Sequence, residues 1–192
     1  MNAMVPGLQG VKMSSSDPNS KIDFLDPPNV VRQKLKKAFC EPGNIKENGV
    51  LSFVEAVLLP ISELHLERMK AETEGGEQSD GKKTFALEGA PEGTLFSVPR
   101  AEQYGGPTHY KTYKELEAAF AAGEIHPGDL KTAVGNAIAS LLEPIQKAYQ
   151  ENEEWQKVTE LAYPTVKEEK KKKKACRWIL KVVLKLVKLV VL

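Results

Sequence analysis

The chain has 192 residues, of which 41% are hydrophobic and 28% charged, which is ordinary for a soluble globular protein and fits one domain with or without appendages. Its two cysteines, Cys40 and Cys176, are too few for a disulfide framework or a cysteine zinc site, so we assign no metal site. Residues 1–20 lack the apolar run of a secretory signal. We therefore expect a reduced, intracellular setting, with the cytoplasm as the default.

The net charge of +1 conceals an uneven distribution along the chain. Residues 167–192 carry ten basic and two acidic side chains, whereas residues 1–166 carry 17 basic and 24 acidic ones. A basic tail on an acidic body indicates an appendage with an anionic partner of its own.

The first part of the chain predicts a loop followed by helices. Residues 1–28 are rich in Gly, Ser, Pro and Asp and are predicted to be loop. The stretch DPPNVVRQKLKKAFC has apolar residues at helical spacing, with Asp26 as its expected N-cap. A mostly buried helix is predicted in NGVLSFVEAVLLPISEL, interrupted near Pro60 because proline cannot donate a helical hydrogen bond. Residues 70–83 are polar and nonperiodic, so we expect an exposed loop there.

A small β element is predicted in the middle of the chain. Two short strands, Thr84–Leu87 and Thr94–Val98, are expected around the turn EGAPEG. A helix follows in TYKELEAAFAAG, where Thr112 and Glu115 form a capping box and Gly123 ends the helix.

The longest predicted helix is HPGDLKTAVGNAIASLLEPIQKAYQ, whose apolar stripe runs from Leu130 to Tyr149. A last helix is expected from about Glu151 to Tyr163, before Pro164. By composition and periodicity alone, the fold is mainly α with a small inserted β-hairpin.

The stretch VPGLQGVKMSSSDPNSKID combines glycines, a lysine and clustered hydroxyls close to the start of the chain. Such a loop can hold a polyphosphate, because lysine supplies a point charge, hydroxyls and backbone N–H groups donate, and glycines let the backbone approach. A short KxSSS pattern by itself is more often a plain serine-rich loop, so the pattern alone leaves both interpretations open.

The match to a known family is much longer than this pattern. MVPGLQGVKMSSSDPNSKID resembles the KMSKS-type signature loop of class I aminoacyl-tRNA synthetases, in the KMSSS form of the eukaryotic and archaeal tyrosyl-tRNA synthetases. The resemblance continues through KKAFCEPGN, QYGG and IHPGDLK and covers about residues 3–164. It implies a tyrosine–tRNA ligase, which converts ATP, L-tyrosine and tRNA(Tyr) into AMP, diphosphate and tyrosyl-tRNA.

The resemblance implies that the opening loop closes over ATP, which enters with Mg²⁺, while tyrosine attacks the α-phosphate. Lys12 would then stabilise the charge that develops on the departing pyrophosphate. Ser14, Ser15 and Ser16 would donate to phosphate oxygens or hold the loop closed, and Met13 would pack it against the body. The expected catalytic residues are Lys12, Ser14 and Ser15.

Three further positions are implied to read the tRNA anticodon. Tyr104 and His126 would stack on the two faces of the first anticodon base, and Asp129 would accept hydrogen bonds from a guanine edge. From the residues alone, HPGD is more often a plain helix start with Asp129 near the positive end of the helix, and Tyr104 a packed turn residue. For Asp129 the two roles are compatible.

The resemblance divides the chain into a signature loop at the end of a catalytic domain (1–23), a helical anticodon-binding domain (24–164) and a tail (165–192). The family's Rossmann-like catalytic domain, with a HIGH-type motif and the tyrosine pocket, is expected upstream and is missing from this sequence. We therefore expect a truncated gene model, a split enzyme or a residual module, inactive by itself. The non-enzymatic alternative is a module that binds tRNA without charging it, and the complete enzyme is expected to be a homodimer.

The tail departs from the family. Five lysines precede a segment dominated by Val, Leu and Ile, in which Arg177, Lys181, Lys185 and Lys188 fall on one stripe of a helix. Residues 170–192 suit contact with a membrane surface, a protein partner or tRNA phosphates. The abrupt change in composition also suits translation into an intron or a shifted frame, and the sequence leaves these alternatives open.

Overall fold

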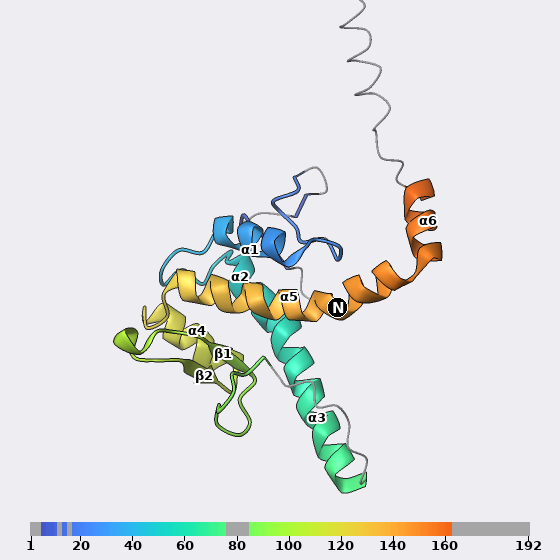
Figure 1. The fold of residues 1–192 in the computed structure, drawn as a ribbon. Helices are drawn as coiled ribbons and strands as arrows, with labels where there is room; N and C mark the ends of the chain where they lie inside the picture. The colour runs from blue at the N-terminus through green and yellow to red at the C-terminus, as the bar shows by residue number, and fades with distance from the viewer. Residues whose placement is uncertain (1–4, 11–12, 15–16, 76–84, 163–192) are drawn as a thin grey trace, which may run out of the picture. The chain divides into compact units, whose positions relative to one another are not determined.

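The computed structural model describes residues 5–10, 13–14, 17–75 and 85–162, and Figure 1 shows the path of the chain through them. Residues 1–146 form one compact unit and residues 147–192 form a second. The described elements confirm a mainly helical protein with a small two-stranded sheet; in chain order they are α1 (Pro28–Lys37), α2 (Gly49–Phe53), η1 (Val54–Leu58), α3 (Leu59–Gly75), β1 (Phe96–Val98), η2 (Glu102–Tyr104), β2 (Thr108–Tyr110), α4 (Tyr113–Ala121), α5 (Pro127–Glu151) and α6 (Glu153–Ala162).

Helix α1 begins without a side-chain cap, so the prediction that Asp26 caps it is wrong. Pro28 occupies the first turn and Pro27 is the N-cap residue, which leaves Asp26 one position too early to reach the first free amides. Its carboxylate instead accepts hydrogen bonds from the Asp23 backbone N–H, at 2.9 Å, and from the Lys34 ammonium. Lys34 is buried, and Asp26 supplies the counter-charge that a buried ammonium requires.

Helix α2 starts at a fully buried cap, Asn48. The Asn48 side-chain oxygen accepts hydrogen bonds from the backbone N–H groups of Val50 and Leu51, both at 3.2 Å. Its amide nitrogen donates to the Asn44 carbonyl at 3.1 Å and to the Cys40 sulfur at 3.4 Å. Cys40 packs in the core as expected, and burial raises the pKa of its thiol.

The interruption predicted near Pro60 takes the form of a π-helical segment, η1, between α2 and α3. Proline lacks an N–H and crowds the carbonyl four residues earlier, and a wider turn accommodates both effects. The run Gly49–Met69 is long and apolar enough to cross a membrane, but many of its apolar residues lie in the core of this unit. Because α3 continues to Gly75, the loop predicted for residues 70–83 is wrong for 70–75, and the remainder lies outside the described residues.

The small sheet joins β1 and β2 in antiparallel register, with Phe96 opposite Tyr110 and Val98 opposite Thr108. The predicted pairing of Thr84–Leu87 with Thr94–Val98 is therefore wrong. In the described residues the earlier segment contributes only an isolated parallel bridge, from Phe85 to Phe96.

Helix α4 confirms its predicted ends. The Thr112 hydroxyl accepts from the Glu115 backbone N–H at 3.3 Å, and the Glu115 carboxylate accepts from the Lys111 N–H at 2.9 Å. Gly123 follows the helix with a φ of 77°, a left-handed conformation that favours glycine.

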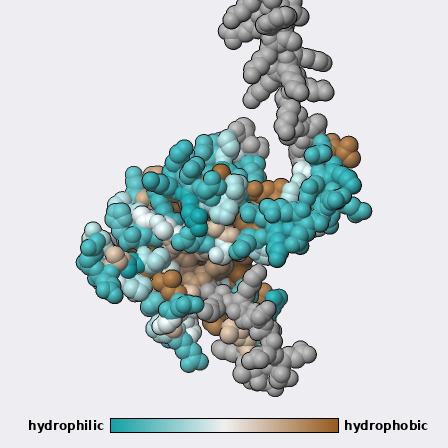
Figure 2. Space-filling model, viewed as in Figure 1, coloured by the Kyte–Doolittle hydropathy of each residue, from teal (hydrophilic) through white to brown (hydrophobic). Residues whose placement is uncertain are grey.

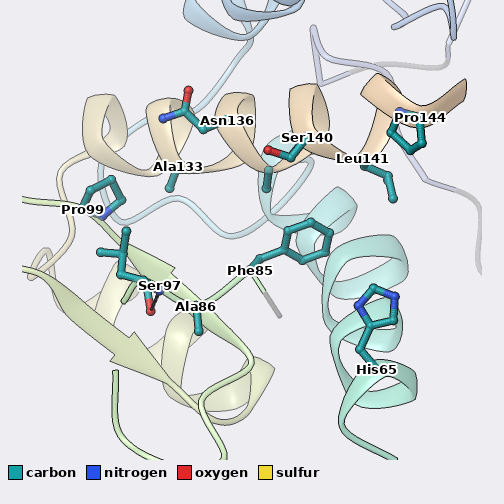
Figure 3. A pocket seen from close by; sticks show the side chains of 12 residues that line it. His65, Phe85, Ala86, Ser97, Pro99, Ala133, Asn136, Ser140, Leu141 and Pro144 are labelled. Carbon is teal, nitrogen blue, oxygen red and sulfur yellow. Dashed lines mark hydrogen bonds between the residues drawn. The ribbon is translucent and has the colours of Figure 1, made fainter. Parts of the chain in front are cut away.

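Helix α5 buries the first half of the predicted apolar stripe, at Leu130, Val134 and Ile138, whereas the second half is not buried and Ile145 is exposed. Its Gly135 lies against α1, since a Cβ there would sit 3.4 Å from the Leu35 side chain. Figures 1 and 3 show α5 lying over both the hairpin and α3. The largest fully buried side chains of this core are Phe96, Phe120, Leu35, Leu51, Leu58, Leu116 and Leu130.

In the second unit, α6 confirms the last predicted helix, although it begins two residues later, at Glu153. The Asn152 side chain caps it by accepting from the Trp155 N–H at 3.0 Å. Trp155, Val158 and Leu161 are exposed along it. The predicted tail, residues 165–192, lies outside the described residues.

We predict that Asn48→Ala lowers the free energy of unfolding by about 2–3 kcal/mol, because it removes a cap and leaves buried groups without partners. Thr112→Ala removes a single exposed cap bond and should cost only about 1 kcal/mol. Urea unfolding of both variants, followed by circular dichroism, measures the difference. Equal losses would show that burial adds nothing to the Asn48 cap.

Candidate functional site

The opening loop is fastened to the body at its base. The Leu8 backbone N–H donates to the Ser20 carbonyl at 3.0 Å, and the Phe39 N–H donates to the Leu8 carbonyl at 2.7 Å. Three of the predicted ATP-loop residues, Lys12, Ser15 and Ser16, lie outside the described residues. The described base therefore shows how the loop is anchored to the end of α1.

A buried hydroxyl, that of Ser20, closes the loop on itself. It accepts from the Ser14 backbone N–H at 3.1 Å and lies 2.8 Å from the carbonyl oxygens of both Ser14 and Asp17. The Met13 side chain next to this turn is 48% exposed, so half of it is open to solvent. Sequence analysis did not single out Ser20, because nothing in its local pattern distinguishes it from the other serines of the stretch.

Two glycines let the loop approach the body closely. A Cβ on Gly49, at the start of α2, would lie only 2.5 Å from the Gly7 carbonyl oxygen. Gly10 has a φ of 79°, and a Cβ there would lie 3.0 Å from the Phe39 ring. The base of the loop is thus pressed against α2 in a way that only glycine permits.

The predicted reader residues His126 and Asp129 lie at the start of α5. The His126 Nδ1 atom accepts a hydrogen bond from the Gly128 backbone N–H at 3.0 Å, and the His126 carbonyl accepts from the Asp129 N–H at 3.0 Å. Because Nδ1 is the acceptor, the neutral ring carries its hydrogen on Nε2. His126 is exposed, and the Asp129 side chain is 35% exposed in the first turn of the helix.

Asp129 has a cationic neighbour that sequence analysis missed. The Arg100 Nε atom lies 3.6 Å from the Asp129 Oδ2 atom, and the Arg100 side chain is 24% exposed. That Nε atom is buried, and among the described residues it has no hydrogen-bond partner. The local sequence around Arg100 gives no signal for this pair, because its partner lies in a different element far along the chain.

Tyr104 lies in η2, on the connection between β1 and β2 that also carries Arg100. It is 65% exposed, so it is not the packed turn residue that its two glycine neighbours also suggested. The Arg100–Asp129 ion pair ties this connection to the first turn of α5. The structure thus brings Arg100 and Asp129 together, with His126 in the same turn as Asp129.

Tyr110, in β2, also feels the charge of Arg100. Burial raises the pKa of Tyr110, the Glu124 carboxylate raises it further, and the Thr108 hydrogen bond and the Arg100 charge oppose these effects. Arg100 therefore acts on two neighbours at once, Asp129 and Tyr110.

A separate cavity of about 460 Å³ lies between α3, the 85–87 segment, β1 and α5. Figure 3 shows small side chains at Ala86, Ser97 and Ala133, with Phe85 and His65 beside them. Figure 2 shows apolar surface in this region of an otherwise largely hydrophilic face. Its described lining includes no Asp, Glu, Lys or Arg, so it does not suit a polyphosphate.

Comparisons with known proteins identify the class. Residues 1–143 match the family described as tRNA synthetases class I (W and Y), and the chain belongs to this family. It is 44% identical over 174 residues to the cytoplasmic tyrosine–tRNA ligase of Saccharomyces cerevisiae, covering 90% of this chain and 38% of the yeast protein. It is 46% identical over 164 residues to the cytoplasmic tyrosine–tRNA ligase of Danio rerio, covering 85% of this chain and 25% of that protein.

A solved structure supports the same family. The tyrosyl-tRNA synthetase of Pyrococcus horikoshii, complexed with L-tyrosine, superposes with a TM-score of 0.57 at 30% identity, over 77% of this chain and 36% of that one. The resemblance to tyrosyl-tRNA synthetases drawn from the sequence is therefore confirmed. The chain spans less than half the length of these relatives.

We predict that Gly49→Ala loosens the base of the opening loop, because the new Cβ displaces Gly7. Amide exchange at Leu8 and Phe39 should become at least about tenfold faster, which corresponds to about 1.4 kcal/mol of local stability. Hydrogen exchange followed by mass spectrometry measures these amides.

Gly135→Ala serves as the matched control, because its Cβ would meet side-chain atoms at an ordinary 3.4–3.6 Å. It should leave exchange in the opening loop unchanged and slightly stabilise α5. Unchanged exchange in Gly49→Ala would contradict the close approach described above.

Proposed function

We propose that this chain forms the part of a tyrosine–tRNA ligase that contains the ATP-closing loop and the anticodon reader. The complete reaction takes ATP, L-tyrosine and tRNA(Tyr) to AMP, diphosphate and tyrosyl-tRNA. The observation that carries the proposal is the similarity to cytoplasmic tyrosine–tRNA ligases across 85–90% of the chain. Their names also support a cytoplasmic location.

In this proposal residues 1–23 are the signature loop, residues 24–164 the anticodon-binding domain and residues 165–192 a tail. Within the tail, residues 170–192 contact a membrane or a protein partner. The complete enzyme works as a homodimer. These assignments go beyond the family match of residues 1–143. They are supported by the anchored base of the loop and by the helical body that follows it.

On the ATP side, Lys12 meets the charge of the departing pyrophosphate, and Ser14, Ser15 and Ser16 donate to phosphate oxygens of the Mg²⁺-bound substrate. Met13 lies within the same loop. The Ser20 hydroxyl supports this arrangement because it fixes the backbone at Ser14, next to the donors. Catalysis then rests on positioning and charge.

On the tRNA side, exposed rings at Tyr104 and His126 are suited to stacking on the first anticodon base. The Asp129 carboxylate is suited to accept from the N1–H and N2–H donors of a guanine edge, because about a third of it is open to solvent. The neutral His126 ring already uses Nδ1 within the turn, which leaves its faces and Nε2–H for RNA.

The anticodon assignment is tested by Asp129→Asn in the 192-residue chain. An amide replaces one acceptor oxygen by a donor, so binding of an anticodon stem-loop with guanine at the first position should weaken by about 1–3 kcal/mol, or about 5- to 150-fold. Binding of the same RNA with adenine there should change little. Fluorescence anisotropy of labelled RNA gives both affinities.

Glu63→Gln, an equal charge change on the exposed surface of α3, should leave the preference for guanine intact. If Asp129→Asn also keeps the full preference for guanine, Asp129 does not read the base and the anticodon assignment fails.

A further inference from the structure

The Arg100–Asp129 pair is an unusual arrangement for two charges at a protein surface. Neither side chain is freely solvated, since Arg100 is 24% and Asp129 35% exposed. The Nε···Oδ2 distance of 3.6 Å is too long for a good hydrogen bond. The buried Nε donor therefore lacks a protein partner among the described residues, which costs free energy in the unbound chain.

Arg100 and Asp129 lie on two different elements, and each element is held in place by its own contacts. Asp129 lies in the first turn of a long helix whose start is fixed by the His126 ring. Arg100 follows β1, whose Val98 is buried and paired with Thr108. Because both elements are fixed, the Arg100 charge restricts the rotation of the Asp129 carboxylate more than it would be restricted in water.

A guanine edge requires such a restriction. It presents two parallel N–H donors, so both carboxylate oxygens have to lie in the plane of the base to accept them. Arg100 lies on the Oδ2 side of the carboxylate. Its positive charge also offsets the repulsion between Asp129 and the phosphates of an approaching RNA.

We propose that Arg100 is a positioning residue of the anticodon reader, which orients the Asp129 carboxylate toward the first anticodon base and compensates its charge against the RNA backbone. This inference rests on the proposed function. It assigns Arg100 to base selection through Asp129, as distinct from direct contact with phosphate.

The test compares Arg100→Gln, Asp129→Asn and the double variant in the full 192-residue chain. Each is titrated with anticodon stem-loops that carry guanine or adenine at the first position, at several salt concentrations. Arg100→Gln should reduce the preference for guanine about tenfold. Because Arg100 acts through Asp129, the double variant should be no less selective than Asp129→Asn alone.

Arg100→Lys keeps the charge but loses the planar guanidinium, so it should retain part of the preference for guanine. It also replaces Arg100→Gln if that variant does not fold, as judged by circular dichroism. In that case the proposal stands if Arg100→Lys lowers selectivity measurably and is overturned if its selectivity is unchanged.

The outcomes separate the two proposals. If Asp129→Asn keeps its preference for guanine, the anticodon assignment fails and the role of Arg100 fails with it. If Asp129→Asn loses the preference but Arg100→Gln keeps it, only the positioning role is overturned. A uniform loss for both RNAs that leaves the preference for guanine unchanged would also overturn the positioning role, because it would show that the Arg100 charge acts on the RNA backbone alone.

Discussion

The burial of helix α5 is the constraint on which the unit of residues 1–146 depends. Leu130, Val134 and Ile138 are all but inaccessible to solvent, and α1, α3 and the hairpin pack around the same helix. From Pro127 to Glu143 the helix is a rod of about 25 Å, because its own backbone hydrogen bonds fix about 1.5 Å per residue, and Pro144 interrupts this ladder before Gln146. Segments that contact different points of α5 are therefore held at set separations.

Two of these contacts concern the regions that the proposed function singles out. At the start of the helix, Asp129 meets Arg100 from the hairpin connection. Twenty residues into it, the Gln146 side-chain amide donates to the carbonyls of Phe24 and Asp26, directly after the opening loop. On the proposed function, the anticodon reader and the end of the ATP loop are therefore attached to separate points of the same helix, on the two sides of Pro144. A synthetase needs such a frame, since one tRNA has to be recognised far from the site where its end is charged.

Sequence predicted the features that depend on neighbouring residues, such as the Thr112 cap and the apolar stripe in the first half of α5. It failed at the start of α1, where tandem prolines shift the N-cap from Asp26 to Pro27. It also failed for the sheet, because β1 pairs with Thr108–Tyr110, while Phe85 in the predicted partner strand makes a single isolated bridge. The candidate site divides in the same way: its loop and helix start carry local motifs, whereas Arg100 meets Asp129 only because folding brings the two together. A single arginine carries no trace of such a distant partner in its local pattern. Ser20 differs, because its partners Ser14 and Asp17 are local, but several serines of the same stretch could have made such bonds.

On the proposed function, the start of α5 combines structural and recognition chemistry in the same side chains. His126 satisfies a free helix amide through Nδ1, and this bond is also what fixes the tautomer and the orientation of its exposed ring. Asp129 gains from the positive end of the helix dipole and from Arg100, and both reduce the cost of holding a carboxylate near RNA phosphates. A carboxylate without such compensation would repel the backbone of the strand it reads. On the proposed function, local charge compensation therefore lets Asp129 serve as a hydrogen-bond acceptor for a base, although residues 1–166 are acidic as a whole.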